Sequence, residues 1–305
     1  VILQFGGQTP LKLAHKIGPV LGTNPDAIDL CEDRSRFNAF CERLGIRQPR
    51  GATANTIPEA HRAAGAIGYP LLVRPSYVLG GRSMAICYDG ADFEKAVDDA
   101  MKASEAKSLL IDQYLAGAVE YDVDAVCDGD EVFIGGIIEH IEEAGVHSGD
   151  SSGVLPPVRL SEAMRKEMEE QTAMIAKELG VIGLVNIQYA LHDDTLYVLE
   201  VNPRASRTVP FVSKAVGVPL ARVATQVCLG HKLADMDLRK RGQGMYFIKA
   251  PVFPWRKFPG ADVLLGPEMR STGEVMGWDR SFAGAFLKAQ MGAGMVLPRE
   301  GRAFI

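Results

Sequence analysis

The sequence lacks several features that would assign it to common protein classes. It has no run of 18 apolar residues, so no membrane-spanning helix is expected. Its five cysteines are odd in number and form no Cys-x-x-Cys pair, which argues against a disulfide framework or a zinc site and favours a reducing cytoplasm. Lys and Arg total 33 against 38 Asp and Glu, and no basic patch points to nucleic acid.

Familiar nucleotide-binding motifs are also missing. There is no GxxxxGK[ST] pattern and no GxGxxG pattern, so neither a Walker-type site nor a dinucleotide-binding fold is indicated. We find no internal repeat. The chain starts Val-Ile-Leu-Gln-Phe, without an initiator Met or a signal peptide, and we expect it to be a piece of a longer polypeptide.

What is present is typical of a folded protein of about two domains, with 305 residues, 47% hydrophobic and 23% charged. Periodicity and turn residues predict an α+β fold with two lobes, because hairpins and helices are mixed with few βαβ alternations. The predicted strands are 1–5, 71–73, 107–115 and the hairpins 119–127/131–138 and 184–191/196–202. The predicted helices are 26–44, 57–67, 161–180 and 211–229, followed by Pro-rich coil.

The second hairpin holds the most informative residues. If its loop centres on Asp194, Gln188 lies opposite Glu200, and Asn202 shares their face because side chains alternate along a strand. One carboxylate and two amide oxygens suit Mg²⁺ or Mn²⁺ bridging to phosphates. Arg204 and Arg207 follow, and cations beside such a site can hold a transferring phosphoryl group. The alternative is a hairpin with a polar, solvated face.

Two loops are further candidates for ligand contact. Arg74 ends a strand before the loop 75–82, where Gly80 and Gly81 allow the backbone to approach phosphate oxygens, although an ordinary turn is the simpler interpretation. The polar stretch 139–152 is of the kind that closes over a substrate, and its His147 is suited to bind phosphate or to act as an acid or base. A solvated loop with a surface His is the alternative there. Glu120, at a strand start, is suited to bind a ribose hydroxyl or simply to face solvent.

Together these stretches resemble the large subunit of carbamoyl phosphate synthetase, over essentially all 305 residues. The resemblance rests on long motifs, found at 6–10 (GGQTP), 73–82 (VRPSYVLGGR), 139–150 (EHIEEAGVHSGD), 200–204 (EVNPR) and 266–277 (GPEMRSTGEVMG). The 73–82 and 266–277 forms look like the second, C-terminal half of that subunit. The resemblance implies an ATP-grasp fold, in which two lobes clamp a nucleotide, preceded by part of a Rossmann-like subdomain.

The resemblance also implies domain limits and site residues. Residues 1–30 would be the remnant of the preceding subdomain, 31–235 the ATP-grasp domain with a small lobe at about 70–145, and 236–305 the stretch leading towards a regulatory domain. The implied metal ligands are Gln188, Glu200 and Asn202, and the implied catalytic residues are Arg204, Arg207 and His147. The implied nucleotide contacts are Arg74, Gln113, Leu115, Glu120, Gly145, Val146, His147, Ser148, Gln188 and Glu200.

The implied activity is ATP-dependent phosphorylation of carbamate to carbamoyl phosphate, a ligase step in pyrimidine and arginine biosynthesis. ATP and Mg²⁺ or Mn²⁺ would be required, and residues around 140–151 would bind K⁺. The expected partners are the glutaminase small subunit and the remaining large-subunit domains, with no nucleic acid and no membrane. Two alternatives stay open, namely another ATP-grasp ligase such as a biotin carboxylase and a catalytically silent nucleotide-binding fragment.

Overall fold

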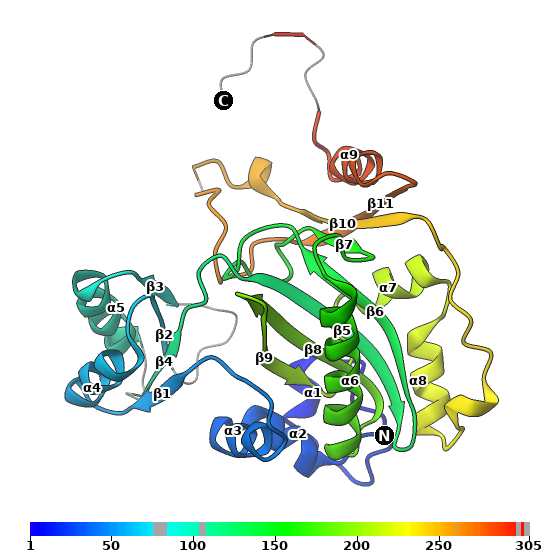
Figure 1. The fold of residues 1–305 in the computed structure, drawn as a ribbon, viewed down its shortest axis with the longest axis horizontal. Coiled ribbons are helices and arrows are strands. Elements are labelled where there is room, and N and C mark those ends of the chain that lie inside the picture. The colour runs from blue at the N-terminus through cyan, green and yellow to red at the C-terminus, as the bar shows by residue number, and fades with distance from the viewer. Residues whose placement is uncertain (76–83, 104–107, 261, 297–299, 302–305) are drawn as a thin grey trace.

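The computed structural model describes residues 1–75, 84–103, 108–260, 262–296 and 300–301 (Figure 1). In these ranges the strands form two antiparallel sheets. A four-stranded sheet contains β1 (Gly51–Ala54), β2 (Leu71–Pro75), β3 (Ala85–Cys87) and β4 (Leu109–Gln113), in the order β1-β4-β2-β3. A seven-stranded sheet contains β5 (Val119–Asp128), β6 (Val132–His140), β7 (Gly153–Leu155), β8 (Ile182–His192), β9 (Thr195–Asn202), β10 (Tyr246–Val252) and β11 (Gly273–Asp279). Its order is β11-β10-β7-β6-β5-β8-β9, and the predicted α+β class is confirmed.

The four-stranded sheet carries its helices on one face. Helices α4 (Ile57–Ile67) and α5 (Gly90–Ala103) pack on it, and Figure 1 shows this unit to one side of the larger sheet. Strand β2 alternates as period-two patterning requires, with Leu71 and Val73 fully buried in the core beneath the helices. Arg74 therefore belongs to the opposite face. The strands of this sheet lie between residues 51 and 113, whereas β5 and β6 belong to the larger sheet, and the small lobe at about 70–145 stays a prediction.

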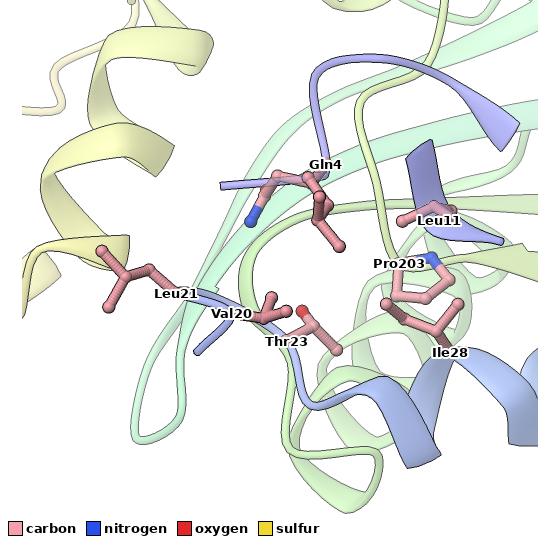
Figure 2. A pocket seen from close by; sticks show the side chains of 8 residues that line it. Gln4, Leu11, Val20, Leu21, Thr23, Ile28 and Pro203 are labelled. Carbon is pink, nitrogen blue, oxygen red and sulfur yellow. The ribbon is translucent and has the colours of Figure 1, made fainter. Parts of the chain in front are cut away.

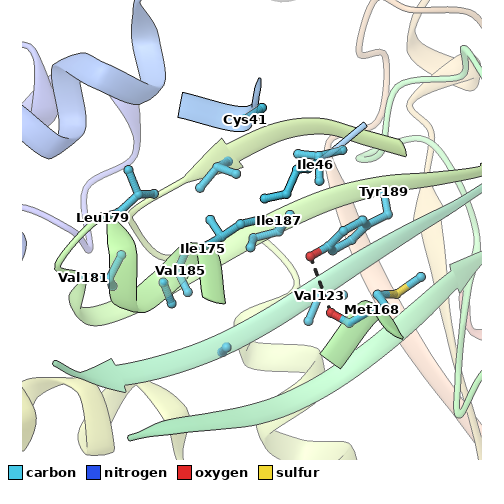
Figure 3. Packing of buried hydrophobic residues seen from close by; sticks show 14 of the residues in the cluster. Cys41, Ile46, Val123, Met168, Ile175, Leu179, Val181, Val185, Ile187 and Tyr189 are labelled. Atoms are coloured by element: carbon cyan, nitrogen blue, oxygen red, sulfur yellow. Dashed lines mark hydrogen bonds between the residues drawn. The ribbon is translucent and has the colours of Figure 1, made fainter. Parts of the chain in front are cut away.

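The seven-stranded sheet is covered on both faces, which explains why β5 is buried at eight consecutive positions. Helices α3 (Arg34–Arg43) and α6 (Glu162–Glu178) pack with one face, and α7 (Val209–Val216) and α8 (Leu220–Cys228) pack with the other. Figure 3 shows the first of these cores, where Ile175 lies with Ile187 and Tyr189 donates a hydrogen bond to the Met168 carbonyl at 3.5 Å. This rigid sheet carries the hairpin singled out in the sequence.

Three sequence predictions for elements within residues 1–229 were wrong. Residues 1–5 form no extended strand, and only Ile2 bridges to Leu21, near α1 (Gln8–Leu11). The helix predicted at 26–44 is two helices, α2 (Pro25–Glu32) and α3, because Asp33 is extended and its carboxylate accepts a hydrogen bond from the Arg36 amide. The helix predicted at 211–229 breaks at Gly217, whose φ is +69°, and ends there as α7 before α8 begins.

The stretch predicted as Pro-rich coil is more ordered than expected. It contains β10, β11 and α9 (Phe282–Gly292), together with the short 3₁₀ turns Leu233–Asp235 and Trp255–Lys257. Helix α9 lies against both strands, and a Cβ on Gly277 would clash with the Ala289 amide nitrogen and the Ala285 carbonyl. Only glycine permits so close an approach. Across the described ranges, no helix is long and apolar enough to cross a membrane.

Candidate functional site

The hairpin of β8 and β9 pairs Gln188 with Glu200, as predicted, but the geometry differs from the prediction. The turn is made by two residues, Asp193 and Asp194, both in the left-handed region with φ of 47° and 54°. A two-residue turn centred between them would place Gln188 opposite Leu199. The register shifts between Gln188 and Tyr189, so a β-bulge adds one residue to β9 and brings Glu200 opposite Gln188.

The bulge also decides which side chains face the core. Val198 and Val201 are both buried in the core formed with α3 and α6, although they are three residues apart. Glu200 is thereby left exposed, with Asn202 two residues further on. Asn202 Nδ2 donates a hydrogen bond to Glu200 Oε1, and Arg204 Nη2 donates to Asn202 Oδ1 at 2.8 Å. The structure thus brings together Glu200, Asn202 and Arg204, and it engages the amide oxygen that Asn202 would offer a metal ion.

Buried ionic residues lie beside Gln188 on the neighbouring strand. Asp122 of β5 pairs with Gln188, and its Oδ2 contacts His140 Nε2 at 2.9 Å. His140 Nδ1 lies 3.5 Å from Glu120 Oε2. Burial alone lowers the pKa of His140, but the hydrogen bonds and negative charges of Asp122 and Glu120 outweigh it and raise that pKa to about 9. A cationic His140 therefore compensates both carboxylates at neutral pH.

The turn that carries Arg204 and Arg207 is held by a buried carboxylate. Asp124 of β5 is fully buried and accepts hydrogen bonds from Asn186 Nδ2 at 3.0 Å, Ser206 Oγ at 2.7 Å and Thr208 Oγ1 at 2.6 Å. Burial raises the pKa of Asp124 to about 6 despite these hydrogen bonds. Two of the three donors flank Arg207, so Asp124 fixes the path of the backbone between the two arginines.

The N-terminal segment also contacts the turn that carries Arg204 and Arg207. The Gln4 carbonyl accepts a hydrogen bond from the Ala205 amide at 2.8 Å, and the Gln4 side chain bonds the Ile182 carbonyl and the Leu184 amide of β8. Figure 2 shows Gln4 beside a cavity of roughly 10 Å³, the room of about one water molecule, which Pro203 also lines. This cavity is far too small for a nucleotide, and the segment acts as a support for the turn.

The loop 141–152 is buried or half-buried over most of its length and is hydrogen-bonded to the rest of the fold, so it is not the solvated loop that its polarity allowed. Asp150, Ser151 and Ser152 are buried. At its start, the Gly145 amide donates to Glu120 Oε1 at 3.0 Å, and Tyr114 Oη donates to the Ala144 carbonyl at 2.7 Å. The residue predicted to bind ribose thus also anchors the loop that contains Val146, His147 and Ser148.

His147 and Arg207 meet at Gly149. A Cβ on Gly149 would lie 2.9 Å from Arg207 Nη1 and 3.2 Å from both His147 Nδ1 and Met269 Sδ. Burial lowers the pKa of His147, Arg207 lowers it further, and Asp150 and Glu200 oppose the shift. The imidazole is therefore neutral at pH 7. Because Nδ1 accepts from the Gly149 amide at 3.0 Å, the network assigns the proton to Nε2, which is left as a donor.

The four-stranded sheet contributes Arg74, which lies near an interlobe ion pair. Arg34 of α3 contacts Asp112 of β4 with both terminal nitrogens, and Arg74 Nε is 3.7 Å from Asp112 Oδ2. In the part of the chain that the structure describes, this buried Nε has no hydrogen-bond partner. The predicted glycine loop at 77–82 lies outside the described residues. Arg74 therefore keeps a donor for an anionic ligand.

Gln113 and Leu115 are placed at the link between the two sheets. The Gln113 side chain accepts hydrogen bonds from the amide and Nε of Arg50, both at 3.4 Å, and is thus turned towards β1. Leu115 is buried in a small cluster with Ala144 and Ala190, next to the start of the loop 141–152. The structure brings Leu115 to that loop, whereas the contacts of the Gln113 side chain are with Arg50.

Sequence reasoning missed the contribution of β10 and of the segment 266–271. Lys249 of β10 is 1% exposed, and its Nζ donates to the Ser148 carbonyl at 2.8 Å. The Gly266 carbonyl accepts from the His147 amide at 2.8 Å, and Asp150 accepts from two amides of this segment. A lysine within the apolar strand Tyr246–Val252 was a readable signal, because a charged side chain is almost never buried without partners.

The donor set at the hairpin fits a divalent ion shared with phosphates. Among the described residues, no group of three His, Cys, Asp or Glu side chains is placed to hold a metal ion. One carboxylate, from Glu200, and the amide oxygens of Gln188 and Asn202 leave several coordination positions for water or phosphate oxygens, as Mg²⁺ prefers. Asn202 would have to release Arg204 Nη2 to join them, while Arg204 Nη1 donates to the Ala205 carbonyl at 3.1 Å.

A family model and several curated proteins match this sequence. The family model described as "Carbamoyl-phosphate synthase L chain, ATP binding domain" matches residues 33–236. The chain is 54% identical over its whole length to the carbamoyl phosphate synthase large chain of Rubrobacter xylanophilus and 53% identical to that of Archaeoglobus fulgidus. In each case the chain spans 29% of the length of the relative.

Solved structures share the fold at low sequence identity. A biotin carboxylase from Campylobacter jejuni superposes with a TM-score of 0.73 at 18% identity, covering 92% of this chain and 70% of that one. An N5-carboxyaminoimidazole ribonucleotide synthetase from Thermus thermophilus has a TM-score of 0.73 at 18% identity, covering 97% and 82%. These similarities establish the ATP-grasp type of α+β fold and nothing of the substrate.

Proposed function

The chain belongs to the carbamoyl-phosphate synthase L chain family of ATP-binding domains, and from this premise we propose that it phosphorylates carbamate with ATP. The observation that carries the proposal is the convergence at the end of one hairpin, where Glu200, Asn202 and Arg204 are in contact and His147 and Arg207 meet at Gly149. In the reaction, a carbamate oxygen attacks the γ-phosphorus, the bond to ADP breaks, and carbamoyl phosphate leaves. Carbamate is already an anionic nucleophile, so no strong base is needed.

We assign the nucleotide to the space between the two sheets. Arg74, whose Nε is paired with Asp112 at 3.7 Å but has no hydrogen-bond partner among the described residues, would contact the phosphate tail. Glu120 would hold ribose hydroxyls, and the backbone near Leu115 and residues 145–148 would line the base and phosphates. Gln113 would reach the nucleotide only after leaving Arg50. Backbone amides and charged side chains around a polyanion are the usual recognition elements for a triphosphate.

Gln188, Glu200 and Asn202 would hold Mg²⁺, or Mn²⁺ in its place, and a bound ion there would neutralise charge on the phosphates. Arg204 and Arg207 would bind oxygens of the migrating phosphoryl group, where positioning and charge neutralisation supply most of the rate acceleration. His147 is neutral and donates from Nε2, so we give it a hydrogen-bonding role towards that group in preference to a general-base role. Residues around 140–151 would bind K⁺.

The assembled enzyme is part of the same proposal. Because the chain spans 29% of its relatives, the glutaminase small subunit and the remaining large-subunit domains are proposed partners, and the cytoplasm is the proposed compartment, in line with five free thiols. Identities of 52–54% to large chains support carbamate over a biotin carboxylase substrate, since the biotin carboxylase structures at 18–20% identity carry the fold alone.

The test is ATP formation from ADP and carbamoyl phosphate in the presence of Mg²⁺ and K⁺. We expect the wild-type chain to form ATP, and Glu200→Gln to lower turnover at least tenfold, about 1.4 kcal/mol of barrier. Glu170→Gln on the exposed face of α6 is the matched control and should leave turnover unchanged. Near-native turnover of Glu200→Gln at saturating Mg²⁺ would refute the metal assignment. Nucleotide binding by wild type without ATP formation would instead indicate a silent nucleotide-binding module.

A further inference from the structure

Asp150 joins two segments that are far apart in the sequence. Its side chain is fully buried, and its Oδ2 and Oδ1 accept hydrogen bonds from the backbone amides of Arg270 and Ser271 at 2.7 and 2.8 Å. A carboxylate with both oxygens bound to backbone amides makes strong charge-assisted hydrogen bonds. We refer to Asp150 with these two amides as the Asp150 clamp.

Three further contacts hold the same loop, two of them from the segment 266–271 and one from β10. The His147 amide donates to the Gly266 carbonyl at 2.8 Å, Ser271 Oγ donates to the Gly149 carbonyl at 2.9 Å, and Lys249 Nζ donates to the Ser148 carbonyl at 2.8 Å. Every one of these bonds falls on residues 147–150. Both segments that make them come after residue 236, where the match to the family model ends.

The loop is therefore held in two separate halves. The first half is anchored to the sheet and the interlobe link, by Glu120 at the Gly145 amide and by Tyr114 at the Ala144 carbonyl. The second half, which bears His147 and packs against Arg207 through Gly149, is anchored by the Asp150 clamp and its neighbours. The two sets of anchors involve different residues, although the Ile141 amide also donates to the Ser152 carbonyl at 2.9 Å, so loss of the clamp should disturb the second half more than the first.

We propose that Asp150 is a positioning residue, which fixes His147 and, through Gly149 and Met269, Arg207 at the migrating phosphoryl group without touching substrate itself. The proposal rests on the proposed function for the identity of the reaction. It assigns a role to residues 266–271 that the matched segment alone does not contain. Phosphoryl transfer depends on such pre-placement, and misplacement of about 1 Å costs on the order of 10²-fold in rate.

The test compares Asp150→Asn with wild type in ATP formation from ADP and carbamoyl phosphate. Asn keeps the shape but turns one acceptor into an NH₂ group that faces a backbone amide. We expect kcat to fall at least tenfold and KM for ADP to rise by a much smaller factor, because only His147 and Ser148 of the nucleotide-lining residues 145–148 belong to the second half. Calorimetric titration with MgADP should give an unchanged stoichiometry, which shows that the loss of kcat is not a loss of folded protein. Asp262→Asn, an exposed carboxylate in the same connection that accepts the Leu264 amide, is the matched control.

A second variant changes the segment 266–271 instead of the loop that it contacts. Ser271→Ala removes the hydroxyl bond to the Gly149 carbonyl but keeps the amide that Asp150 binds, so we expect a smaller fall in kcat, about twofold to fivefold, again with a smaller change in KM for ADP. Native kcat in both variants, with wild type active, would overturn the positioning role. A rise of KM for ADP as large as the fall of kcat would also overturn it, because the clamp would then act mainly on nucleotide binding. Inactive wild type would refute the proposed function instead.

Discussion

Adding one methyl group at Gly149 tests the arrangement of the proposed catalytic side chains. Its Cβ would lie 2.9 Å from Arg207 Nη1, closer than a carbon and a nitrogen normally approach, and 3.2 Å from His147 Nδ1 and Met269 Sδ. The φ of Gly149 is not in the left-handed region, so the backbone accepts alanine without strain. The Arg207 guanidinium is the free end of a flexible side chain and must therefore move by a few tenths of an ångström or more.

The expected consequence falls on kcat. Removing one well-placed donor at a developing charge lowers kcat by about 10²-fold, roughly 2.7 kcal/mol, and we expect a displaced Arg207 to lose a large part of this, about 10-fold to 100-fold. The free energy of unfolding should change by less than about 1 kcal/mol, because side-chain ends absorb the clash. ATP formation from ADP and carbamoyl phosphate gives kcat, and urea unfolding gives the stability.

Gly273→Ala is the matched control. An added Cβ there meets no atom within 4 Å, so activity and stability should both stay at wild-type values. If Gly149→Ala kept more than half of the wild-type kcat, and a crystal structure showed Arg207 displaced, Arg207 would not contact the migrating group. If Arg207 were found unmoved, the steric argument itself would be wrong.

Two further predictions concern the buried carboxylates and their partners. Asp124→Ala removes the acceptor of three hydrogen bonds, from the buried Asn186 and Thr208 and the half-buried Ser206, so we expect about 3 kcal/mol lower stability in urea unfolding. A loss under about 1 kcal/mol would contradict the anchoring role. The folded-state pKa of His140 is raised to about 9 from 6.5, so its stabilising contribution is complete below pH 6.5 and is lost as pH rises through 9. The free energy of unfolding should therefore decrease more between pH 6.5 and pH 9.5 in wild type than in His140→Gln. An equal decrease in both proteins would refute the assignment.

The pairing of Gln188 with Glu200 could be predicted from the sequence, although for an incomplete reason. Counting residues outward from a loop centred on Asp194 places Gln188 opposite Glu200. In the structure the same pairing results from a two-residue turn and a bulge in β9. The spacing of Val198 and Val201 carried the missing information. Two core residues three apart break the alternation of a regular strand, and a bulge restores it.

The Asp150 clamp could not be predicted in the same way. Its donors are backbone amides 120 and 121 residues away, and an amide has no sequence signature. The polarity of the loop 141–152 indicated solvent exposure. The segment 266–271, which covers part of the loop, is too distant in the sequence for the local pattern to reveal the contact. The short strand Gly51–Ala54 escaped prediction for a related reason, since four small and polar residues show too little alternation to mark a strand.

The continuity of the seven-stranded sheet bears on how the protein can be divided. Strand β7 pairs with β10 through Leu155 opposite Phe247 and Gly153 opposite Lys249. A fragment that stopped at residue 236 would keep every residue of the family match and still lose β10 and β11. The backbone groups of β7 would then form an open sheet edge, a template for pairing between molecules and hence for aggregation. A soluble, expressible catalytic unit should therefore extend at least through α9, which covers the last two strands.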